Sequence, residues 1–592
     1  MPKRTYRRVG SRIALLLLPL AWALASRGAD APARRRAVLI SFDALGGDRL
    51  QALLARPGAL PAGGFRRIAE RGFVAERAVP PTPALTAVSH ITIATGALPA
   101  ATGIVSNTML DRSKPFGTTI SGFDAPIRAE TLWEAAHRQG KRVGSMLFPG
   151  ADGKAPARRA DWGMTWPDWP PNYGKRRRLG EKDWRPSETS EKTFSPARRI
   201  SLPVGSDGHA LTVIAVDGTD DSRVDYDHLR IEPEVGTAVD VRAGDWFSVE
   251  VRSDEGRTGA WCKLLALEPD LSRTELYIGP LNRNTGYPRE FVRSLDENVG
   301  FWPGRADVDA FGAGSDHPEV FFEQLERLAD HITRAQLFAI ARKDWDLLLC
   351  YQPEIDSLGH EFWITDPAQR GFTWDRAAKS VETVDRAYAL ADRSVDAIER
   401  ALTPQDGIFV TSDHGMTPIW SEIYPNEILR HAGLASFDSE KKPLPSSSAY
   451  AVTDGAIANV YLKEGADPSL RERVERLFRE FRVRGESPFE TIARREEAGS
   501  LGLNAPESGD WILIGKIGTH FSKGISEAGS PVGPTTEHAT HGYLNTHREI
   551  QAAFLAAGPG ISHEKVETIG LWQIAARVSW FLGIDPPRDA AR

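Results

Sequence analysis

The sequence lacks an excess of positive charge, a low-complexity tract and any long apolar run beyond its first residues. Its 592 residues carry a net charge of −6, with 41% hydrophobic and 26% charged residues. This composition is that of a globular protein, and the negative charge gives no support to nucleic-acid binding. After the first residues, no segment is apolar and long enough to span a bilayer, so we expect no transmembrane span in the mature chain.

Cysteine is also scarce. The chain has two, Cys262 and Cys350, and neither stands in a spacing typical of metal sites. No C-x-P-x-R segment occurs, which is the segment that sulfatases convert into their nucleophile. An exported chain could pair its two cysteines. Since Cys350 lies in the apolar run DLLLCYQ, however, we expect two separate buried thiols.

The first residues have the three parts of a secretory signal. A basic region with Lys3, Arg4, Arg7 and Arg8 precedes an apolar run over 13–25, which ends in an A-x-A cleavage pattern. The run is shorter than the roughly 20 residues that span a bilayer, which argues against a membrane anchor. We therefore expect a signal peptide at 1–25, a mature chain that begins near Ser26, and a periplasmic or extracellular location.

The length predicts two domains, or one large domain with an insertion. From 36 to 155, apolar runs such as RAVLISFD and KRVGSMLF alternate with helical spacing as in ETLWEAAHRQG, which indicates βαβ units. From 156 to 315, short alternating segments between turn residues indicate a β-rich insertion, or cap. The α/β pattern returns over 316–592. We predict a doubly wound, mostly parallel sheet of α/β class that carries this insertion.

Six residues of metal-ligand type stand in four separate segments, each resembling a strand end that runs into a loop. They are Asp43, Asp356, His360, Asp413, His414 and His541. Ligands of open α/β sheets bind beyond the carboxyl ends of the strands. Three Asp and three His suit two zinc-like ions that each take three protein ligands and keep one position open. Taken singly, each Asp could instead be a helix cap or a turn residue.

Local spacing favours the metal hypothesis. Asp356 and His360 are four residues apart, so one turn of helix would put both on the same side. Asp413 and His414 are adjacent, and both can face one ion only if the chain bends sharply, which the glycine that follows permits.

At this point the residues carry a resemblance to a known family. The segments ISFDALGGD, PALTAVSHITIATGALPAATGIVSNTM, EIDSLGH, VTSDHGM and HGYLN, in this order, resemble the type I phosphodiesterase / nucleotide pyrophosphatase family of the alkaline phosphatase superfamily. The resemblance covers most of the chain outside the insertion. It implies an alkaline phosphatase-like fold and hydrolysis of a small-molecule phosphate ester.

The resemblance also implies roles for single residues. One zinc would be held by Asp356, His360 and His541. The other would be held by Asp43, Asp413 and His414, and would contact Thr86. Thr86 would be the nucleophile and would form a phospho-Thr intermediate. The implied cofactors are two zinc ions, or two other divalent ions. Three neighbouring hydroxyls are alternatives for the nucleophile: Thr82, Ser89 and Thr92.

Two positions beside Thr86 depart from the family pattern. Members usually carry Asn three residues after the nucleophile, where its amide holds a phosphate oxygen, and here that position is Ser89. Nucleotide-cleaving members place an aromatic residue directly after the nucleophile, and here it is Ala87. We expect both residues to contact substrate. Tryptophans near the insertion could supply a base-stacking surface instead, or could simply pack in its core: Trp162, Trp166 and Trp169.

Two alternatives to a phosphodiesterase or pyrophosphatase stay open. A phosphomonoesterase of the same superfamily needs extra cations around the more highly charged phosphate, and Lys154 is the one candidate between 148 and 154. A non-catalytic exported binding protein would use the β-rich insertion, but the complete set of six ligand-type residues argues against it.

Overall fold

The computed structural model describes residues 35–152, 158–167, 174–189, 192–206, 208–465 and 467–591. The signal peptide predicted at 1–25, Lys154 and Trp169 lie outside these ranges. Within the described part, no helix is long and apolar enough to cross a membrane.

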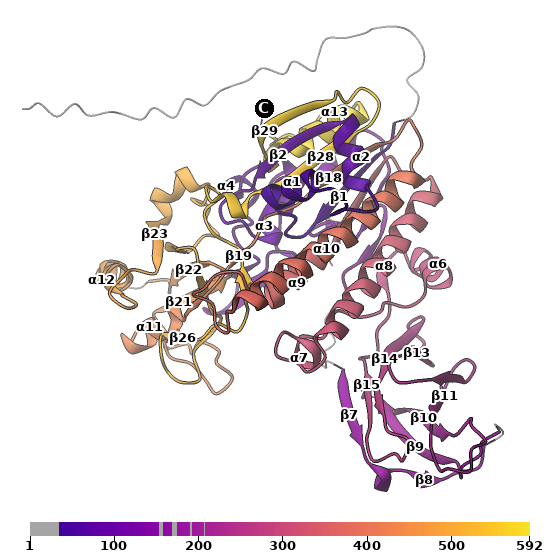
Figure 1. The fold of residues 1–592 in the computed structure, drawn as a ribbon. Coiled ribbons are helices and arrows are strands. Elements are labelled where there is room, and N and C mark those ends of the chain that lie inside the picture. The colour runs from indigo at the N-terminus through magenta and orange to yellow at the C-terminus, as the bar shows by residue number, and fades with distance from the viewer. Residues whose placement is uncertain are drawn as a thin grey trace, which may run out of the picture. The chain divides into compact units, whose positions relative to one another are not determined.

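Within the described residues, a nine-stranded sheet forms the centre of the fold, in the order β16-β6-β5-β17-β1-β18-β28-β2-β29. Figure 1 labels β1, β18, β28, β2 and β29 of this sheet. Its strands are β1 Ala37–Phe42, β2 Phe73–Val79, β5 Val143–Met146, β6 Trp162–Thr165, β16 Thr285–Tyr287, β17 Leu347–Gln352, β18 Gly407–Thr411, β28 Ala552–Ala557 and β29 Glu564–Gly570. β1 pairs in parallel with both β17 and β18. The pairs β5–β17, β5–β6 and β2–β29 are also parallel. The predicted mostly parallel sheet is thereby confirmed.

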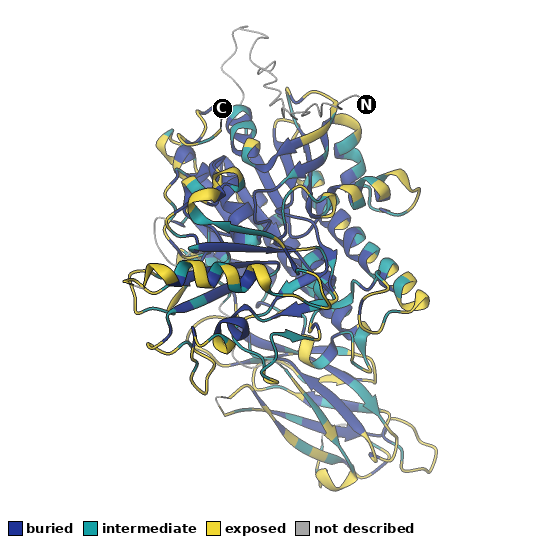
Figure 2. Cartoon of the chain, turned by 90° about the vertical axis from the view of Figure 1, so that its left-hand side faces the viewer, coloured by how far each residue is buried: buried dark blue, intermediate teal, exposed yellow. Residues whose placement is uncertain are grey.

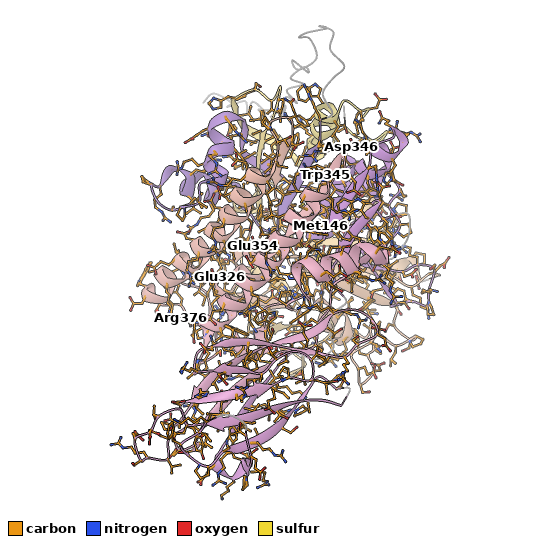
Figure 3. All side chains as sticks on the ribbon, turned by 90° about the vertical axis from the view of Figure 1, so that its right-hand side faces the viewer. Met146, Glu326, Trp345, Asp346, Glu354 and Arg376 are labelled. Atoms are coloured by element: carbon orange, nitrogen blue, oxygen red, sulfur yellow. The ribbon has the colours of Figure 1, made fainter. Side chains whose placement is uncertain are left out.

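The five innermost strands of this sheet are buried along their whole length, as their apolar sequences predict. Every residue of β1, β5, β17, β18 and β28 is buried, and Figure 2 shows the inside of the molecule in dark blue. Strands covered on both faces need apolar residues at every position rather than at every second one. Figure 3 labels Trp345 and Asp346 just before β17 and Glu354 just after it.

Two groups of helices pack against the central sheet. The first group contains α2 Gly64–Arg71, α8 Pro318–Arg342, α9 Glu354–Phe362 and α10 Trp374–Ala401. The second contains α3 Thr86–Thr95, α5 Leu132–Arg138 and α13 Ile574–Leu582. α5 begins at a capping box, in which Thr131 accepts from the backbone of Glu134 and the Glu134 side chain accepts from the backbone of Thr131. This two-sided cover is the doubly wound arrangement that the sequence predicts.

Two antiparallel sheets lie within the segment predicted as a β-rich insertion. One has the order β12-β11-β10-β9-β8 and the other the order β13-β14-β15-β7. Their strands are β7 Lys175–Leu179, β8 Arg185–Pro186, β9 Arg198–Val204, β10 His209–Val216, β11 His228–Glu232, β12 Val239–Val241, β13 Trp246–Val251, β14 Thr258–Leu267 and β15 Thr274–Ile278. They share a core of their own, which contains Cys262. Cys262 and Cys350 are both buried and free, as expected.

The predicted division into 36–155 and 316–592 as catalytic core and 156–315 as insertion stays a prediction. Two strands inside 156–315, β6 and β16, extend the central sheet rather than the antiparallel ones. Between β16 and α8 lies α6 Arg289–Val299, which packs on α8.

A further sheet, not predicted from the sequence, lies within 316–592. It has the order β21-β22-β24-β23, formed by β21 Ala449–Asp454, β22 Ile457–Leu462, β23 Phe489–Arg494 and β24 Trp511–Gly515. Helices α11 Pro425–His431 and α12 Pro468–Glu480 share its core. The turn between β21 and β22 reaches the candidate site, because Ala456 N–H donates to the carbonyl of His541 at 2.9 Å.

Candidate active site

The six predicted ligands lie at one edge of the central sheet. The register aligns Ser41 near the end of β1 with Thr411 at the end of β18, and Phe42 with Gln352 at the end of β17. Asp43 and Asp413 therefore follow neighbouring parallel strands at the same edge, where α/β folds bind their ligands. α9 begins directly after β17 and carries Asp356 and His360 four residues apart on one helical face. His541 follows the short strand β27 Ala539–Thr540, which pairs with β19 Thr417–Pro418.

These residues form two groups whose ligand atoms lie close enough to hold an ion. In one group, the ligand atoms of Asp43, Asp413 and His414 all lie within 4.8 Å of one another. In the other, those of Asp356, His414 and His541 do so. His414 thus stands between the two groups, and its ring stacks on that of His541 with centroids 3.7 Å apart. His360 joins the second group through Asp356, since its Nε2 lies 3.2 Å from Asp356 Oδ1.

In each of the three aspartates, one carboxylate oxygen has no hydrogen-bond partner among the described residues. Asp43 Oδ1, Asp356 Oδ1 and Asp413 Oδ2 are buried and accept no hydrogen bond from the residues that the structure describes. In Asp43 and Asp413, the other carboxylate oxygen accepts hydrogen bonds. Asp43 Oδ2 accepts from the Tyr351 hydroxyl at 2.5 Å, and Asp413 Oδ1 accepts from the Ala44 and His414 N–H groups at 3.2 and 3.0 Å. Buried oxygens that lack a donor fit a cation.

The three imidazoles also turn their Nε2 atoms toward these oxygens. Each Nδ1 contacts a backbone carbonyl, that of Ala539 for His360, of Gly415 for His414 and of Ala84 for His541, at 2.9, 3.0 and 3.1 Å. A hydrogen bond of this kind fixes the tautomer and leaves Nε2 free to bind a metal. The donor set, three carboxylate oxygens and three imidazole nitrogens, therefore fits zinc-like ions.

The electrostatics of the site also favour bound cations. Burial raises the pKa of Asp43 well above its usual value, and the neighbouring charge of Asp413 raises it further. Burial, and then the charge of Asp356, raise the pKa of Asp413 to about 7. Burial lowers the pKa of His414 to about 3, so this ring is neutral, as a ligand must be. Carboxylates whose charge is so unfavourable need positive charge beside them to stay ionised.

Gly415 is required here for a reason that the sequence does not reveal. Its backbone does not adopt a positive φ. A Cβ at this position would instead collide with the carbonyl oxygen of Glu549. The glycine therefore permits the close approach of two chain segments behind Asp413 and His414.

Thr86 places a hydroxyl beside the two groups of candidate ligands. It is the first residue of α3, and its Oγ1 lies 3.4 Å from His414 Nε2. Thr86 is partly exposed, whereas the alternatives Thr82, Ser89 and Thr92 are buried. Of these four residues, Thr86 is thus the one that solvent reaches.

Asn107 is a polar neighbour of Thr86 and is not among the site residues predicted from the sequence. Its Oδ1 accepts the N–H of Ala87 at 2.8 Å, which leaves its amide NH₂ group to donate elsewhere. The two predicted substrate contacts are more enclosed, since Ser89 is 0% and Ala87 1% exposed. The Ser89 hydroxyl has no hydrogen-bond partner among the described residues. The segment IVSNTM gave only one signal for Asn107, which was its place within the family resemblance.

A second missed residue is Glu537. Its Oε2 lies 3.0 Å from His360 Nδ1, on the side of the ring opposite Asp356. Burial lowers the pKa of His360, but the charges of Asp356 and Glu537 together hold it well above its usual value. A carboxylate behind a ligating histidine orients the ring and makes it more basic.

The tryptophans near the insertion were expected either to stack on a base or to pack in the core, and the two that the structure describes differ in this respect. Trp162 is buried and packs against Phe291, as the packing interpretation predicts. Trp166 is only partly buried, and its ring lies 6.0 Å from that of Tyr351, whose hydroxyl bonds Asp43. Trp166 therefore stands near the candidate site.

Comparison with known proteins gives one family and several solved structures. The model of a family described as type I phosphodiesterase / nucleotide pyrophosphatase matches residues 37–241 and 266–544. Human ectonucleotide pyrophosphatase / phosphodiesterase 5 is similar with 15% identity and a TM-score of 0.49, over 93% of this chain and 96% of that chain. An inactive variant of the murine counterpart, in complex with AMP, shares 15% identity with a TM-score of 0.48 over the same proportions.

A bacterial enzyme is similar to the same extent. Phosphonoacetate hydrolase from Sinorhizobium meliloti 1021, in complex with phosphonoformate, shares 16% identity with a TM-score of 0.47, over 93% of this chain and 96% of that chain. No curated protein matches the chain significantly.

Proposed function

Since the chain belongs to the type I phosphodiesterase / nucleotide pyrophosphatase family, it is a metal-dependent hydrolase of phosphate esters, and we propose that it uses two zinc ions and Thr86 as nucleophile. The observation that carries this proposal is the set of buried oxygens on Asp43, Asp356 and Asp413 that accept no hydrogen bond from the described residues and face imidazole Nε2 atoms.

The proposed ligands follow the two sets that the family resemblance implies. Asp43, Asp413 and His414 hold one ion. Asp356, His360 and His541 hold the other. Two such ions, when bound, supply positive charge that lowers the pKa of a nearby hydroxyl and offsets the charge of a phosphoryl group.

The residues of the chain then have separate tasks. Thr86 Oγ1 attacks the phosphorus, its proton passes to water, and the ester oxygen leaves with its organic group. Water next cleaves phospho-Thr86, releasing the phosphoryl group and restoring the hydroxyl. The Asn107 amide donates to a non-bridging phosphoryl oxygen, because its own oxygen is held by Ala87 N–H and its NH₂ group is left to donate.

The Thr86 proposal is tested by Thr86→Ala. The variant should lose more than about 10³-fold of its rate on bis-p-nitrophenyl phosphate, as removal of a nucleophile does, while elemental analysis still finds its metal. Thr82→Ala is the matched control, since Thr82 is a buried hydroxyl nearby. Full activity of Thr86→Ala, or a purified protein that binds no zinc and stays inert when zinc is added, would contradict the proposal.

We propose a phosphodiester or pyrophosphate substrate rather than a phosphomonoester. Rates on bis-p-nitrophenyl phosphate and p-nitrophenyl phosphate compare the two under one set of conditions. A strong preference for the monoester would overturn this choice. If the diester is preferred, rates on a panel of nucleotides, sugar nucleotides and head-group diesters would identify the leaving group.

We also propose that the protein is exported, on the strength of the signal sequence predicted at 1–25. N-terminal sequencing of the protein from the periplasmic and culture fractions tests this. A chain that begins near Ser26 is expected, and an uncleaved chain confined to the cytoplasm would refute export.

A further inference from the structure

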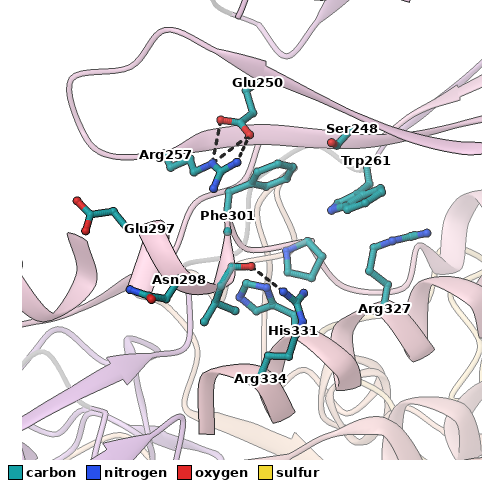
Figure 4. Close-up of a pocket in the computed structure, with 13 residues that line it drawn as sticks. Ser248, Glu250, Arg257, Trp261, Glu297, Asn298, Phe301, Arg327, His331 and Arg334 are labelled. Atoms are coloured by element: carbon teal, nitrogen blue, oxygen red, sulfur yellow. Dashed lines mark hydrogen bonds and ion pairs between the residues drawn. The ribbon is translucent and has the colours of Figure 1, made fainter. Parts of the chain in front are cut away.

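A cavity of about 400 Å³ lies where the β13–β14 hairpin faces α8 and the end of α6 (Figure 4). Ser248 and Trp261 line it from the hairpin, Phe301 lines it from the segment after α6, and Arg327, His331 and Arg334 line it from α8. None of the six proposed metal ligands lines this cavity, and neither does Thr86. The cavity is therefore separate from the candidate active site.

Arg327 is held in this cavity by two indole rings. Its guanidinium carbon lies 4.0 Å from the ring centroid of Trp246 and 4.2 Å from that of Trp261. Rings that cover the faces of a guanidinium leave its N–H groups pointing outward in the plane. An acceptor can therefore approach only at the edge.

Among the described residues, that edge has no protein acceptor. Arg327 donates no hydrogen bond and forms no ion pair within the part of the chain that the structure describes. Glu323 is the acidic side chain that acts on it, but Glu323 Oε2 already accepts from Lys263 Nζ and Trp246 Nε1, each at 2.6 Å. Burial lowers the pKa of Arg327 to about 10, so the group still carries its charge at neutral pH.

The other cations of the cavity are already neutralised. Arg257 donates to Glu250 at 2.6 and 3.0 Å. Arg334 donates to the carboxylate of Asp330 at 3.0 Å and to the carbonyl of Val299 at 2.8 Å. The exposed carboxylate of Glu297 lies on the side of the cavity away from Arg327 (Figure 4). The positive charge that remains to be matched is thus concentrated at Arg327.

We propose that this cavity binds a small organic anion, a carboxylate or a phosphate with a flat apolar body. The anionic head accepts edge-on from the Arg327 guanidinium, which matches two-oxygen acceptors. The flat body lies along Trp261 and Phe301, whose ring centroids are 6.3 Å apart. The site is a second ligand site and does not depend on the hydrolytic reaction.

Binding of three probes to the full zinc-loaded protein, followed by fluorine NMR, tests the proposal. The probes are 4-fluorobenzoate, 4-fluorophenylphosphonate and neutral 4-fluorobenzamide. The first two distinguish a carboxylate head from a phosphate head, and the phosphonate is not an ester. Arg327→Met keeps an unbranched stem between the indoles and removes the charge. It should weaken binding of the preferred anion about 10- to 100-fold, as loss of charge-assisted hydrogen bonds does.

Two further variants keep the test decisive. Ser248→Trp fills the cavity from an exposed strand position and should weaken binding even if Arg327→Met does not fold. Arg386→Met is the matched control, since Arg386 stacks on Phe322 at 3.7 Å outside the cavity, and it should bind like the parent. The proposal is overturned if the benzamide binds as tightly as the anions, or if Arg327→Met and Ser248→Trp both retain the parent affinity.

Discussion

Replacing Asn107 by aspartate separates two tasks that the asparagine performs. Its Oδ1 accepts the N–H of Ala87, the second residue of α3. This N–H is one of the donors that a helix N-terminus leaves unpaired. An aspartate presents an oxygen at the same place, and its charge also suits a helix N-terminus. Asn107→Asp should therefore fold as well as the parent protein, and the position of Thr86 should not change.

The catalytic effect of this replacement should be large. The introduced carboxylate cannot donate, so a phosphoryl oxygen in the transition state loses one oriented donor, which costs about 10²- to 10³-fold in kcat, or about 2.7–4 kcal/mol. The structural bond to Ala87, by contrast, contributes only about 0.5–1.5 kcal/mol and is retained. A loss of rate at unchanged stability would thus identify the donor itself.

The assay compares kcat and KM on bis-p-nitrophenyl phosphate with Tm and zinc content. Asn107→Ala, which loses both tasks, should lower the rate and also Tm. Asn545→Ala is the control, because the Asn545 amide donates only to the carbonyl of Pro80, at 2.9 Å, among the described residues. Loss of an oriented donor should lower the rate by much more than about threefold. If the rate of Asn107→Asp stays within about threefold of the parent rate, the proposed role of the amide is refuted.

Three further predictions concern groups around the site and in the core. Glu537→Gln should weaken zinc affinity about 10- to 100-fold in a chelator competition, whereas Glu527→Gln, which is exposed, should not. Burial lowers the pKa of His331 to about 3 from 6.5. The unfolded chain therefore binds more protons between these values, and the free energy of unfolding falls by about 1.4 kcal/mol per pH unit as the pH drops through this window. His331→Gln should lower the slope measured in urea unfolding at pH 6, 5 and 4, with chelator present, by about this amount, and an unchanged slope would contradict the buried neutral ring. Gly415→Ala should lower stability by about 1–3 kcal/mol through overpacking, while Gly314→Ala, with open space around it, should leave Tm unchanged.

The elements of the central sheet could be predicted because their sequences carry the constraint locally. LISF and LLLC are apolar at nearly every position, and strands buried on both faces require this. The helix over Pro318–Arg342 shows its apolar spacing in the same direct way. The sheet over 449–515 escaped prediction, since its strands are short and are separated by a helix and loops, so no local period marks their pairing.

The candidate site divides in a similar way. Asp356 and His360 could be paired from their spacing alone, because a helix fixes which residues share a face. Glu537 and Asn107 could not be found from spacing, since each meets its partner across a fold contact, at His360 and at Ala87. The contact of Gly415 with the Glu549 carbonyl could not be predicted either, because that carbonyl belongs to a segment far along the chain.

The sequence by itself determined the type of chemistry, since six ligand-type residues and a threonine stand in segments whose local patterns end strands or begin helices. It determined the family as well, because the order of these segments is preserved along the chain. Only the tertiary structure decided which carboxylate oxygens lack hydrogen-bond partners among the described residues, and that His414 stands between the two ligand groups. It also decided that the Arg327 guanidinium lies against two indole rings. The physical reason is that burial, hydrogen bonding and charge pairing depend on distances between segments that are remote in sequence.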